Sequence, residues 1–301
     1  MKLSEIIRPN AVLIRDGSFE SLGQCTANIG KDMLTFLEDP GYLNQLSANT
    51  SIRCVICTPD LVNQLIDAPI GIVAVEQPKL FFFEIHNNLV SKKEIRSEFE
   101  TIIGDNCNIS PSSCISRNNV KIGDNVIVEE HAIIRANVTI GNNCIIRAGS
   151  VIGGQGYEFK RDKENGILRV EHVGSTIIED YVEIKEFCTI HQAVFEWDFS
   201  RIGEHSKLDA HTHIGHATKI GKRVMIGSHG NLAGNIQVED DVYIGPGVTI
   251  SNRLTIGSKS KISIGSVVTK NVDRNKVVTG NFAIDHHLFI KDLKEKNRTL
   301  E

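Results

Sequence analysis

The sequence predicts a mainly β protein, in which a parallel β-helix of six-residue repeats lies between a small α/β domain and a short C-terminal helix. Three observations support this prediction. Aliphatic residues recur every six positions from about residue 102, strand-like and helix-like segments alternate before that point, and a helix-like segment with a basic end closes the chain. The chain has 301 residues, which is enough for two or three modest domains with a sizeable core.

The six-residue period fits neither an amphipathic helix nor an alternating strand. It fits a solenoid in which each hexad forms one flat face and one turn, so that three hexads close a coil. Roughly eight such coils, stacked at ~4.8 Å, would give a prism about 40 Å long. Glycine often follows the aliphatic residue, where a tight corner excludes a side chain. The aliphatic positions are Ile103, Ile109, Ile115, then Ile122, Val128, Ile134, Ile140, Ile146, Ile152, then Ile178, Ile184, Ile190, and finally Ile202, Leu208, Ile214, Ile220, Ile226, Leu232, Val238, Ile244, Ile250, Ile256 and Ile262.

Two segments interrupt the period. Residues 153–177 form a charged, glycine-rich insert in which "ENG" predicts a tight hairpin turn. Between Ile190 and Ile202, Glu196 occupies a position that would face inward. Because a carboxylate cannot lie unpaired in an aliphatic column, we expect the chain to bulge outward there. Loops that leave a rigid solenoid are good places for substrate contacts.

The two ends of the chain lack the hexads. Before residue 101, "IRCVICT" and "GIVAVEQ" predict buried strands, and "PDLVNQLI" and "PKLFFFEIHNNLV" predict helices that begin at proline. The expected domains are therefore 1–100, a small α/β domain, 101–272, the β-helix with its insert at 153–177, and 273–301, a C-terminal extension. Residues 283–298 predict a helix whose basic end either binds an acidic partner or simply complements the helix dipole.

The bulk composition limits the function. The net charge of −4 gives no support for binding nucleic acid or a membrane surface. No apolar run approaches the ~20 residues of a membrane span, and the first ten residues lack a signal-peptide core. The seven scattered cysteines suit free thiols in a reducing compartment. A cytoplasmic location is therefore expected.

Several motifs resemble the LpxD family, the UDP-3-O-acylglucosamine N-acyltransferases of lipid A synthesis. "LTFLEDPGYLNQL" resembles that family's uridine-binding segment, with Phe36 and Tyr42 as the aromatic pair and Asp39 where the family usually has Asn. "IGGQGYEF", which contains Tyr157, resembles the loop before the active-site coils, and "GNFAIDHHLFIKDL" resembles the entry into the C-terminal helix. The resemblance implies a left-handed β-helix, a homotrimer in a bacterial cytoplasm, and substrate contacts from these residues.

The segment "HTHIGHATKIG" carries the candidate catalytic residue. The resemblance places the general base at His216, and its position two residues after the inward Ile214 predicts a corner that faces outward. A histidine with a pKa near 6.5 can accept the proton of an attacking amine. Gly234 follows one coil later and should stack on His216, where its N–H could bind an oxyanion. His211 and His213 should flank the same groove, as substrate-binding residues or as solvated surface residues.

Two positions depart from the family pattern. His191 stands in "TIHQAVFEWD", where the family commonly has Asp, and Arg253 stands in "ISNRLTIG", where the family has a second His. Both positions lie near the cleft for nucleotide sugar and pantetheine in the family. An arginine could bind a phosphate bidentately, which histidine cannot do. Relatives acylate other nucleotide-linked amino sugars, some from coenzyme A thioesters.

The resulting prediction is an N-acyltransferase that moves an acyl group, in the lipid A case a 3-hydroxyacyl group, to a nucleotide-linked amino sugar for surface glycan synthesis. The donor is a phosphopantetheine thioester, either acyl-ACP (on an acyl carrier protein) or acyl-CoA. No permanently bound cofactor or metal is expected. One alternative is a γ-class carbonic anhydrase-like zinc enzyme using His211 and His216, but its third ligand would fall on Ser175. The other alternative is a non-catalytic solenoid scaffold.

Overall fold

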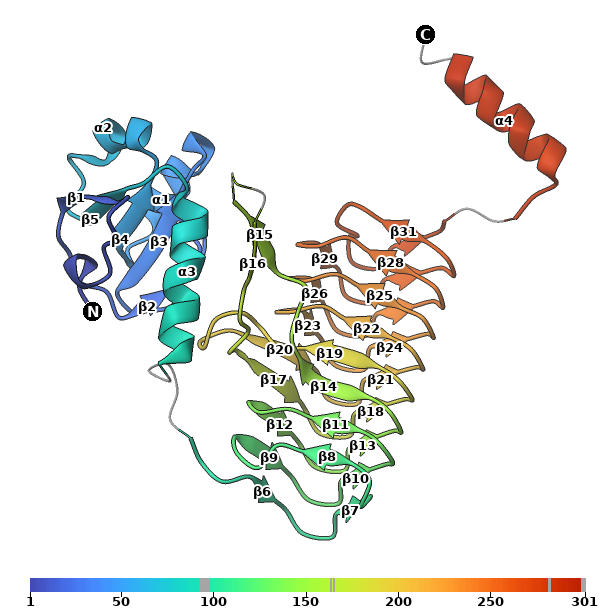
Figure 1. Ribbon diagram of the computed structural model, residues 1–301. Helices are drawn as coiled ribbons and strands as arrows, with labels where there is room; N and C mark the ends of the chain where they lie inside the picture. The colour runs from blue at the N-terminus through green and yellow to red at the C-terminus, as the bar shows by residue number, and fades with distance from the viewer. Residues whose placement is uncertain (93–97, 163, 165, 281–282, 299–301) are drawn as a thin grey trace.

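The computed structural model describes residues 1–92, 98–162, 164, 166–280 and 283–298 (Figure 1). It contains a small α/β domain, a long triangular solenoid and a separate C-terminal helix, in agreement with the predicted fold class. None of the helices in these ranges combines the length and apolar character needed to span a membrane.

The N-terminal domain is built on one five-stranded sheet in the order β1-β5-β4-β3-β2. Only the edge pair β1–β5 is antiparallel, and the other pairs are parallel. The strands are β1 (Val12–Arg15), β2 (Ser21–Leu22), β3 (Met33–Leu37), β4 (Ile52–Cys57) and β5 (Gly71–Ala74). The helices are η1 (Leu3–Glu5), η2 (Pro40–Tyr42), α1 (Leu43–Ala48), η3 (Pro59–Leu61), α2 (Val62–Leu65) and α3 (Pro78–Ser91).

The two faces of this sheet are covered by different helices because successive side chains of a strand point to opposite faces. In β4, Cys54 and Ile56 pack in the cluster with α3, whereas Val55 and Cys57 pack in the cluster with α2. Cys54 and Cys57 are therefore core residues on opposite faces, and burial raises the pKa of each thiol to about 11.

The solenoid consists of three parallel sheets (Figure 1). Their inward side chains form one aliphatic core. One sheet contains β6 (Ile102–Ile103), β9 (Val120–Ile122), β12 (Val138–Ile140), β17 (Ser175–Ile178), β20 (Phe199–Ile202), β23 (Lys219–Ile220), β26 (Gln237–Val238) and β29 (Thr255–Ile256). The second contains β8 (Cys114–Ile115), β11 (Ile133–Ile134), β14 (Val151–Gly154), β19 (Thr189–His191), β22 (His213–Ile214), β25 (Asn231–Leu232), β28 (Thr249–Ile250) and β31 (Val267–Val268). The third contains β7 (Asn108–Ile109), β10 (Ile127–Val128), β13 (Ile145–Ile146), β18 (Glu183–Ile184), β21 (Lys207–Leu208), β24 (Met225–Ile226), β27 (Tyr243–Ile244), β30 (Lys261–Ile262) and β32 (Val277–Val278).

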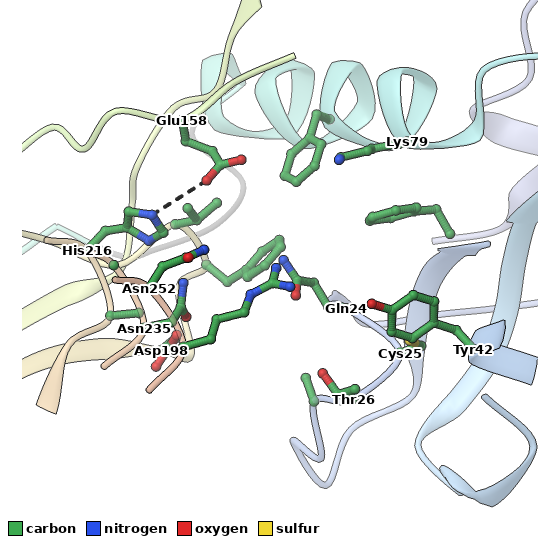
Figure 2. Close-up of a pocket in the computed structure, with 18 of the residues that line it drawn as sticks. Gln24, Cys25, Thr26, Tyr42, Lys79, Glu158, Asp198, His216, Asn235 and Asn252 are labelled. Atoms are coloured by element: carbon green, nitrogen blue, oxygen red, sulfur yellow. Dashed lines mark ion pairs between the residues drawn. The ribbon is translucent and has the colours of Figure 1, made fainter. Parts of the chain in front are cut away.

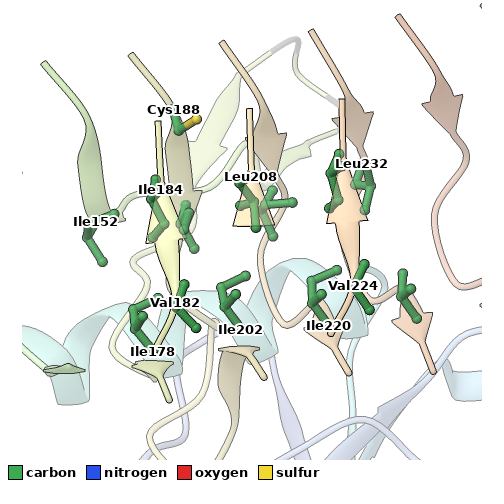
Figure 3. Packing of buried hydrophobic residues seen from close by; sticks show 14 of the residues in the cluster. Ile152, Ile178, Val182, Ile184, Cys188, Ile202, Leu208, Ile220, Val224 and Leu232 are labelled. Carbon is green, nitrogen blue, oxygen red and sulfur yellow. The ribbon is translucent and has the colours of Figure 1, made fainter. Parts of the chain in front are cut away.

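The predicted aliphatic column is the core of this solenoid. Ile184, Leu208 and Ile226 pair in register in neighbouring strands and are buried. Figure 3 shows such rungs on successive coils, with the side chains pointing into the common interior. Strand β32 extends the solenoid past residue 272, which the sequence suggested as its end. The C-terminal helix α4 (His286–Arg298) projects away from the solenoid (Figure 1).

Both interruptions of the repeat attach the N-terminal domain to the solenoid. The insert forms a hairpin of β15 (Phe159–Arg161) and β16 (Ile167–Arg169), although Asn165 of the predicted turn lies outside the described residues. The second interruption bulges outward as predicted, and Glu196 accepts a hydrogen bond from Ser21 Oγ at 2.7 Å. Trp197 Nε1 donates to the carbonyl oxygen of Leu22 at 2.9 Å.

Candidate active site

A cavity of about 630 Å³ lies between the N-terminal domain and the solenoid. In Figure 2, Gln24 and Tyr42 lie at one end of it, and His216 and Asn252 lie at the other. Six of the residues predicted from the sequence line this cavity, namely Phe36, Asp39, Tyr42, His216, Gly234 and Arg253. Residues more than 170 positions apart are therefore brought to one site.

The N-terminal end of the cavity presents aromatic and carboxylate groups. Phe36, on β3, packs against Phe82 and Phe83 of α3 with ring centroids 5.1 and 6.1 Å apart. Asp39 caps η2, and its Oδ1 accepts a hydrogen bond from the Gly41 N–H at 2.8 Å. Tyr42 ends the same turn and remains 42% exposed. Such a surface can stack on a planar base and accept hydrogen bonds from its edge.

The solenoid end of the cavity is a corner built by successive coils. Ala217, Asn235 and Arg253 occupy equivalent positions in three coils, with φ values of +55°, +61° and +61°. His216 and Gly234 precede the first two of these corner residues. A Cβ atom built on Gly234 would lie 2.5 Å from Nε2 of His216, so the prediction that Gly234 stacks on His216 is confirmed.

The imidazole of His216 lies among charged groups. Burial lowers its pKa below the ordinary value of 6.5, and Lys160 and Arg253 also lower it, while Glu158 and Asp198 raise it. The closest of the carboxylates is Glu158, whose Oε2 lies 3.5 Å from Nε2 of His216 (Figure 2). Because the net pKa shift is downward, His216 is neutral at pH 7 and can accept a proton.

A second histidine, His172, supports His216 from the interior. It is 2% exposed, and its ring centroid lies 5.5 Å from that of His216 in a T-shaped arrangement. Its Nδ1 lies 3.1 Å from the carbonyl oxygen of Val170. Because a carbonyl oxygen can only accept a hydrogen bond, Nδ1 carries the proton and donates it. Burial and the neighbouring His216 lower the pKa of His172 to about 4.

His191 and His213 lie beside this pair and do not line the cavity. Their ring centroids are 4.7 Å apart, and His213 Nδ1 lies 2.9 Å from Thr189 Oγ1. Burial, His213 and His216 lower the pKa of His191 to about 4. Both rings thus form a neutral layer next to His216, and a direct substrate contact for either remains a prediction.

Two further predicted residues lie away from the cavity of the same chain. Tyr157 is 87% exposed and packs on Phe159 with ring centroids 4.9 Å apart. His211 occupies another corner, where it stacks between Phe187 and His229 at 5.4 and 4.9 Å. The expectation that His211 flanks the His216 groove is therefore not met within one chain. Five residues span nearly one whole face of the coil, so the two histidines fall at different corners.

In the zinc-enzyme alternative, His211 and His216 were the candidate ligand pair. Within one chain they lie at different corners of the coil, so an ion held by both would have to lie between two subunits. Within the part of the chain that the structure describes, no three or more His, Cys, Asp or Glu side chains are grouped so that they could hold a metal ion.

Sequence reasoning missed several residues around His216. Glu158 and His172 come from the insert, where the six-residue period cannot predict a position. Asp198 comes from the second bulge, where its Oδ1 accepts a hydrogen bond from Lys219 Nζ at 3.0 Å. For Glu158 the available signal was its place in "IGGQGYEF", directly after Tyr157, in the motif that resembled the loop before the active-site coils.

Comparisons with known proteins agree with this architecture. The family model described as bacterial transferase hexapeptide (six repeats) matches residues 119–154, and the model described as hexapeptide repeat of succinyl-transferase matches residues 100–130. A UDP-N-acetylglucosamine acyltransferase from Campylobacter jejuni superimposes with a TM-score of 0.53 at 22% identity, covering 60% of this chain and 68% of that chain. At this identity the superposition shows a shared fold.

Sequence relatives extend the similarity. UDP-3-O-acylglucosamine N-acyltransferase 2 from Sulfurimonas denitrificans is 31% identical over 144 residues, which is 48% of this chain and 45% of that protein. An acyl-[acyl-carrier-protein]–UDP-N-acetylglucosamine O-acyltransferase from Campylobacter concisus is 26% identical over 65% of this chain and 72% of that protein. The match therefore spans less than half the length of the N-acyltransferase from Sulfurimonas denitrificans. The chain therefore contains hexapeptide repeats within residues 100–154 and is similar to a UDP-3-O-acylglucosamine N-acyltransferase over about half of its length.

Proposed function

We propose that the protein is an N-acyltransferase acting on a nucleotide-linked amino sugar. The acyl group, a 3-hydroxyacyl group where the product is a lipid A precursor, arrives as a thioester on phosphopantetheine. The observation that carries the proposal is the shared cavity, in which an aromatic and carboxylate surface at Phe36, Asp39 and Tyr42 faces a neutral imidazole at His216. A pyrimidine nucleotide would bind at the first end and place the sugar amine at the second.

The reaction follows from the groups at the solenoid end. The neutral amine nitrogen attacks the thioester carbonyl carbon, and His216 accepts the proton that the nitrogen loses. The N–H of Gly234 donates to the oxyanion that forms on the carbonyl oxygen. When the C–S bond breaks, the imidazolium returns the proton to the thiolate, so the products are the amide and the free thiol.

The phosphates of the substrates require positive charge in the cavity. Lys79 and Arg253 line it, from the first turn of α3 and from the solenoid corner respectively. The guanidinium of Arg253 can bind a phosphate oxygen pair bidentately. The donor is an acyl carrier protein or coenzyme A, and both present the same phosphopantetheine arm.

We further propose a homotrimer in the cytoplasm, because the LpxD resemblance implies both. The oligomeric state is tested by the mass of the protein in solution. A monomeric mass would overturn the trimer.

The function is tested by mass spectrometry of products from a panel of UDP- and dTDP-linked amino sugars. Each sugar is offered with an acyl carrier protein donor and with a coenzyme A donor. We expect one pairing to give an amide product, and His216→Ala to abolish it without changing the mass of the assembly. If no sugar is acylated with either donor, the proposal fails.

A further inference from the structure

We propose that Glu158, on the insert hairpin, is a positioning residue for His216 that holds the imidazole and stabilises its cationic form during proton transfer. The inference rests on the proposed function, since it assigns a role within the same site. No repeat position supplies this carboxylate. It comes from the segment that leaves the solenoid between β14 and β17.

The contact between Glu158 and His216 is close and partly shielded from solvent. Oε2 of Glu158 lies 3.5 Å from Nε2 of His216, and the two side chains are 23% and 16% exposed. Figure 2 shows the carboxylate directed from the hairpin toward the imidazole, across the solenoid end of the cavity. A charge pair in such a setting interacts more strongly than one on an open surface, because water screens it less.

Lys160 holds the other oxygen of the same carboxylate. Its Nζ forms an ion pair with Oε1 of Glu158, and the lysine side chain is only 12% exposed. The same Nζ lies 4.7 Å from the centroid of the Phe83 ring of α3, in a cation–π contact. The carboxylate is therefore fixed between His216 on the solenoid and α3 of the N-terminal domain.

The hairpin is anchored to α3 because side chains of α3 form hydrogen bonds with the backbone at and just after β16. Asn87 Nδ2 donates to the carbonyl oxygen of Arg169 at 2.6 Å, and Asn87 Oδ1 accepts from the Glu171 N–H at 3.0 Å. His86 Nε2 lies 2.8 Å from the carbonyl oxygen of Glu171. These contacts hold the base of the hairpin, where the Val170 N–H donates to the carbonyl oxygen of Glu158 at 3.0 Å.

Several charged or titratable groups act on His216. Of the carboxylates, Glu158 does most to raise the pKa of His216, and Asp198 adds to this effect. Lys160 and Arg253 act in the opposite direction. The imidazoles of His172, His191 and His213 also face His216, which lowers the pKa of each of them.

The proton transfer explains what the carboxylate contributes. Before attack His216 is neutral, and after it accepts the amine proton it becomes an imidazolium 3.5 Å from a fixed carboxylate. This ion pair exists only from the transition state until the proton passes to the leaving thiolate. An interaction that strengthens only in the transition state raises kcat rather than substrate binding.

The test uses two variants that should act in opposite directions. In Glu158→Gln, which keeps the shape of the side chain, the pKa of His216 should fall because the raising charge is lost. In Lys160→Met, the pKa of His216 should rise because the lowering charge is lost. Both pKa values are measured by NMR titration of the imidazole resonances in the full chain, with His216→Gln used to assign the His216 signal.

The same variants are then assayed across pH. We expect the acid limb of the kcat/KM profile to shift to lower pH in Glu158→Gln and to higher pH in Lys160→Met. We also expect kcat of Glu158→Gln to be about tenfold lower than that of the wild-type enzyme. Glu158→Asp should recover part of the lost kcat. If Glu158→Gln leaves both the His216 titration and the acid limb unchanged, the positioning role is wrong.

The two measurements separate the two proposals. The NMR titration needs no substrate, so it tests the Glu158–His216 pair even if no acylation is found. A shifted titration without any acyl transfer would contradict the proposed function alone. An active enzyme with an unshifted titration would contradict the role of Glu158 alone. The unfolding midpoint of each variant shows whether it folds like the wild-type protein.

Discussion

Gly234 lies so close to His216 that a Cβ atom on residue 234 would fall 2.5 Å from Nε2 of the imidazole. The two residues belong to successive coils, and the Asn235 N–H donates to the carbonyl oxygen of His216 at 2.8 Å. The backbone therefore cannot move apart to admit a side chain. Gly234 is needed to leave His216 its position, independently of any oxyanion that its N–H binds.

Gly234→Ala should displace the imidazole and lower kcat about a hundredfold, since a shift of about 1 Å in a catalytic group has this effect. The measurement is kcat at saturating substrates, together with the unfolding midpoint. A matched control is Gly265→Asn, because residue 265 has φ +66° and open space around a built Cβ, and Asn235 tolerates φ +61° at a similar corner. Full activity in Gly234→Ala would contradict the steric argument.

His216→Gln should lower kcat about a thousandfold, because it removes the group that accepts the amine proton. The mass of the assembly in solution should not change. His211→Gln is the control, since His211 is exposed at another corner of the solenoid. An equal loss in both variants would show that the base does not reside at the His216 corner alone.

The repeat explains which parts of this site could be predicted from the sequence. A period of six residues fixes the coil, so Gly234 could be placed on His216 by spacing alone, and the structure confirms it. The same arithmetic fails for Glu158 and His172, because the insert leaves the solenoid and its path depends on packing against α3. Contacts such as that of Asn87 with β16 are long-range and have no local sequence signal.

The N-terminal domain shows a similar limit. Strands β4 and β5 were predicted, because strands buried on both faces are mostly apolar, and only Arg53 of β4 is charged and exposed. The edge strand β1 was not predicted, since its residues are mostly exposed and depend on pairing with β5. That Phe36 and Tyr42 share a cavity with His216 depends on the docking of two domains, for which the sequence offered only a family resemblance.

Tyr42→Ala should raise KM for the nucleotide sugar about tenfold and leave kcat nearly unchanged, because it removes a stacking surface remote from the reacting atoms. Tyr42 suits this test better than Phe36, which packs against Phe82 and Phe83 and contributes to the core. Tyr243→Ala, at a similarly exposed tyrosine of the solenoid, is the control. If KM is unchanged in Tyr42→Ala, the nucleotide does not bind at this end of the cavity.

Acidification should destabilise the protein through His172. Its pKa is about 4 in the folded chain and near 6.5 when unfolded. Between these values the unfolded state binds more protons, so the free energy of unfolding falls as pH decreases from about 6.5 to about 4 and is insensitive to His172 above that window. The pKa difference corresponds to about 3 kcal/mol at most for this buried group.

His172→Gln should therefore lose less stability than the wild-type protein between about pH 7 and pH 4.5, when both are unfolded by urea. A pH dependence should remain, because burial also lowers the pKa of His86, His191, His213 and His216. His205→Gln, at a half-exposed histidine whose side chain is 51% accessible, should follow the wild-type curve. Equal losses in His172→Gln and the wild-type protein would mean that His172 is not held neutral by burial.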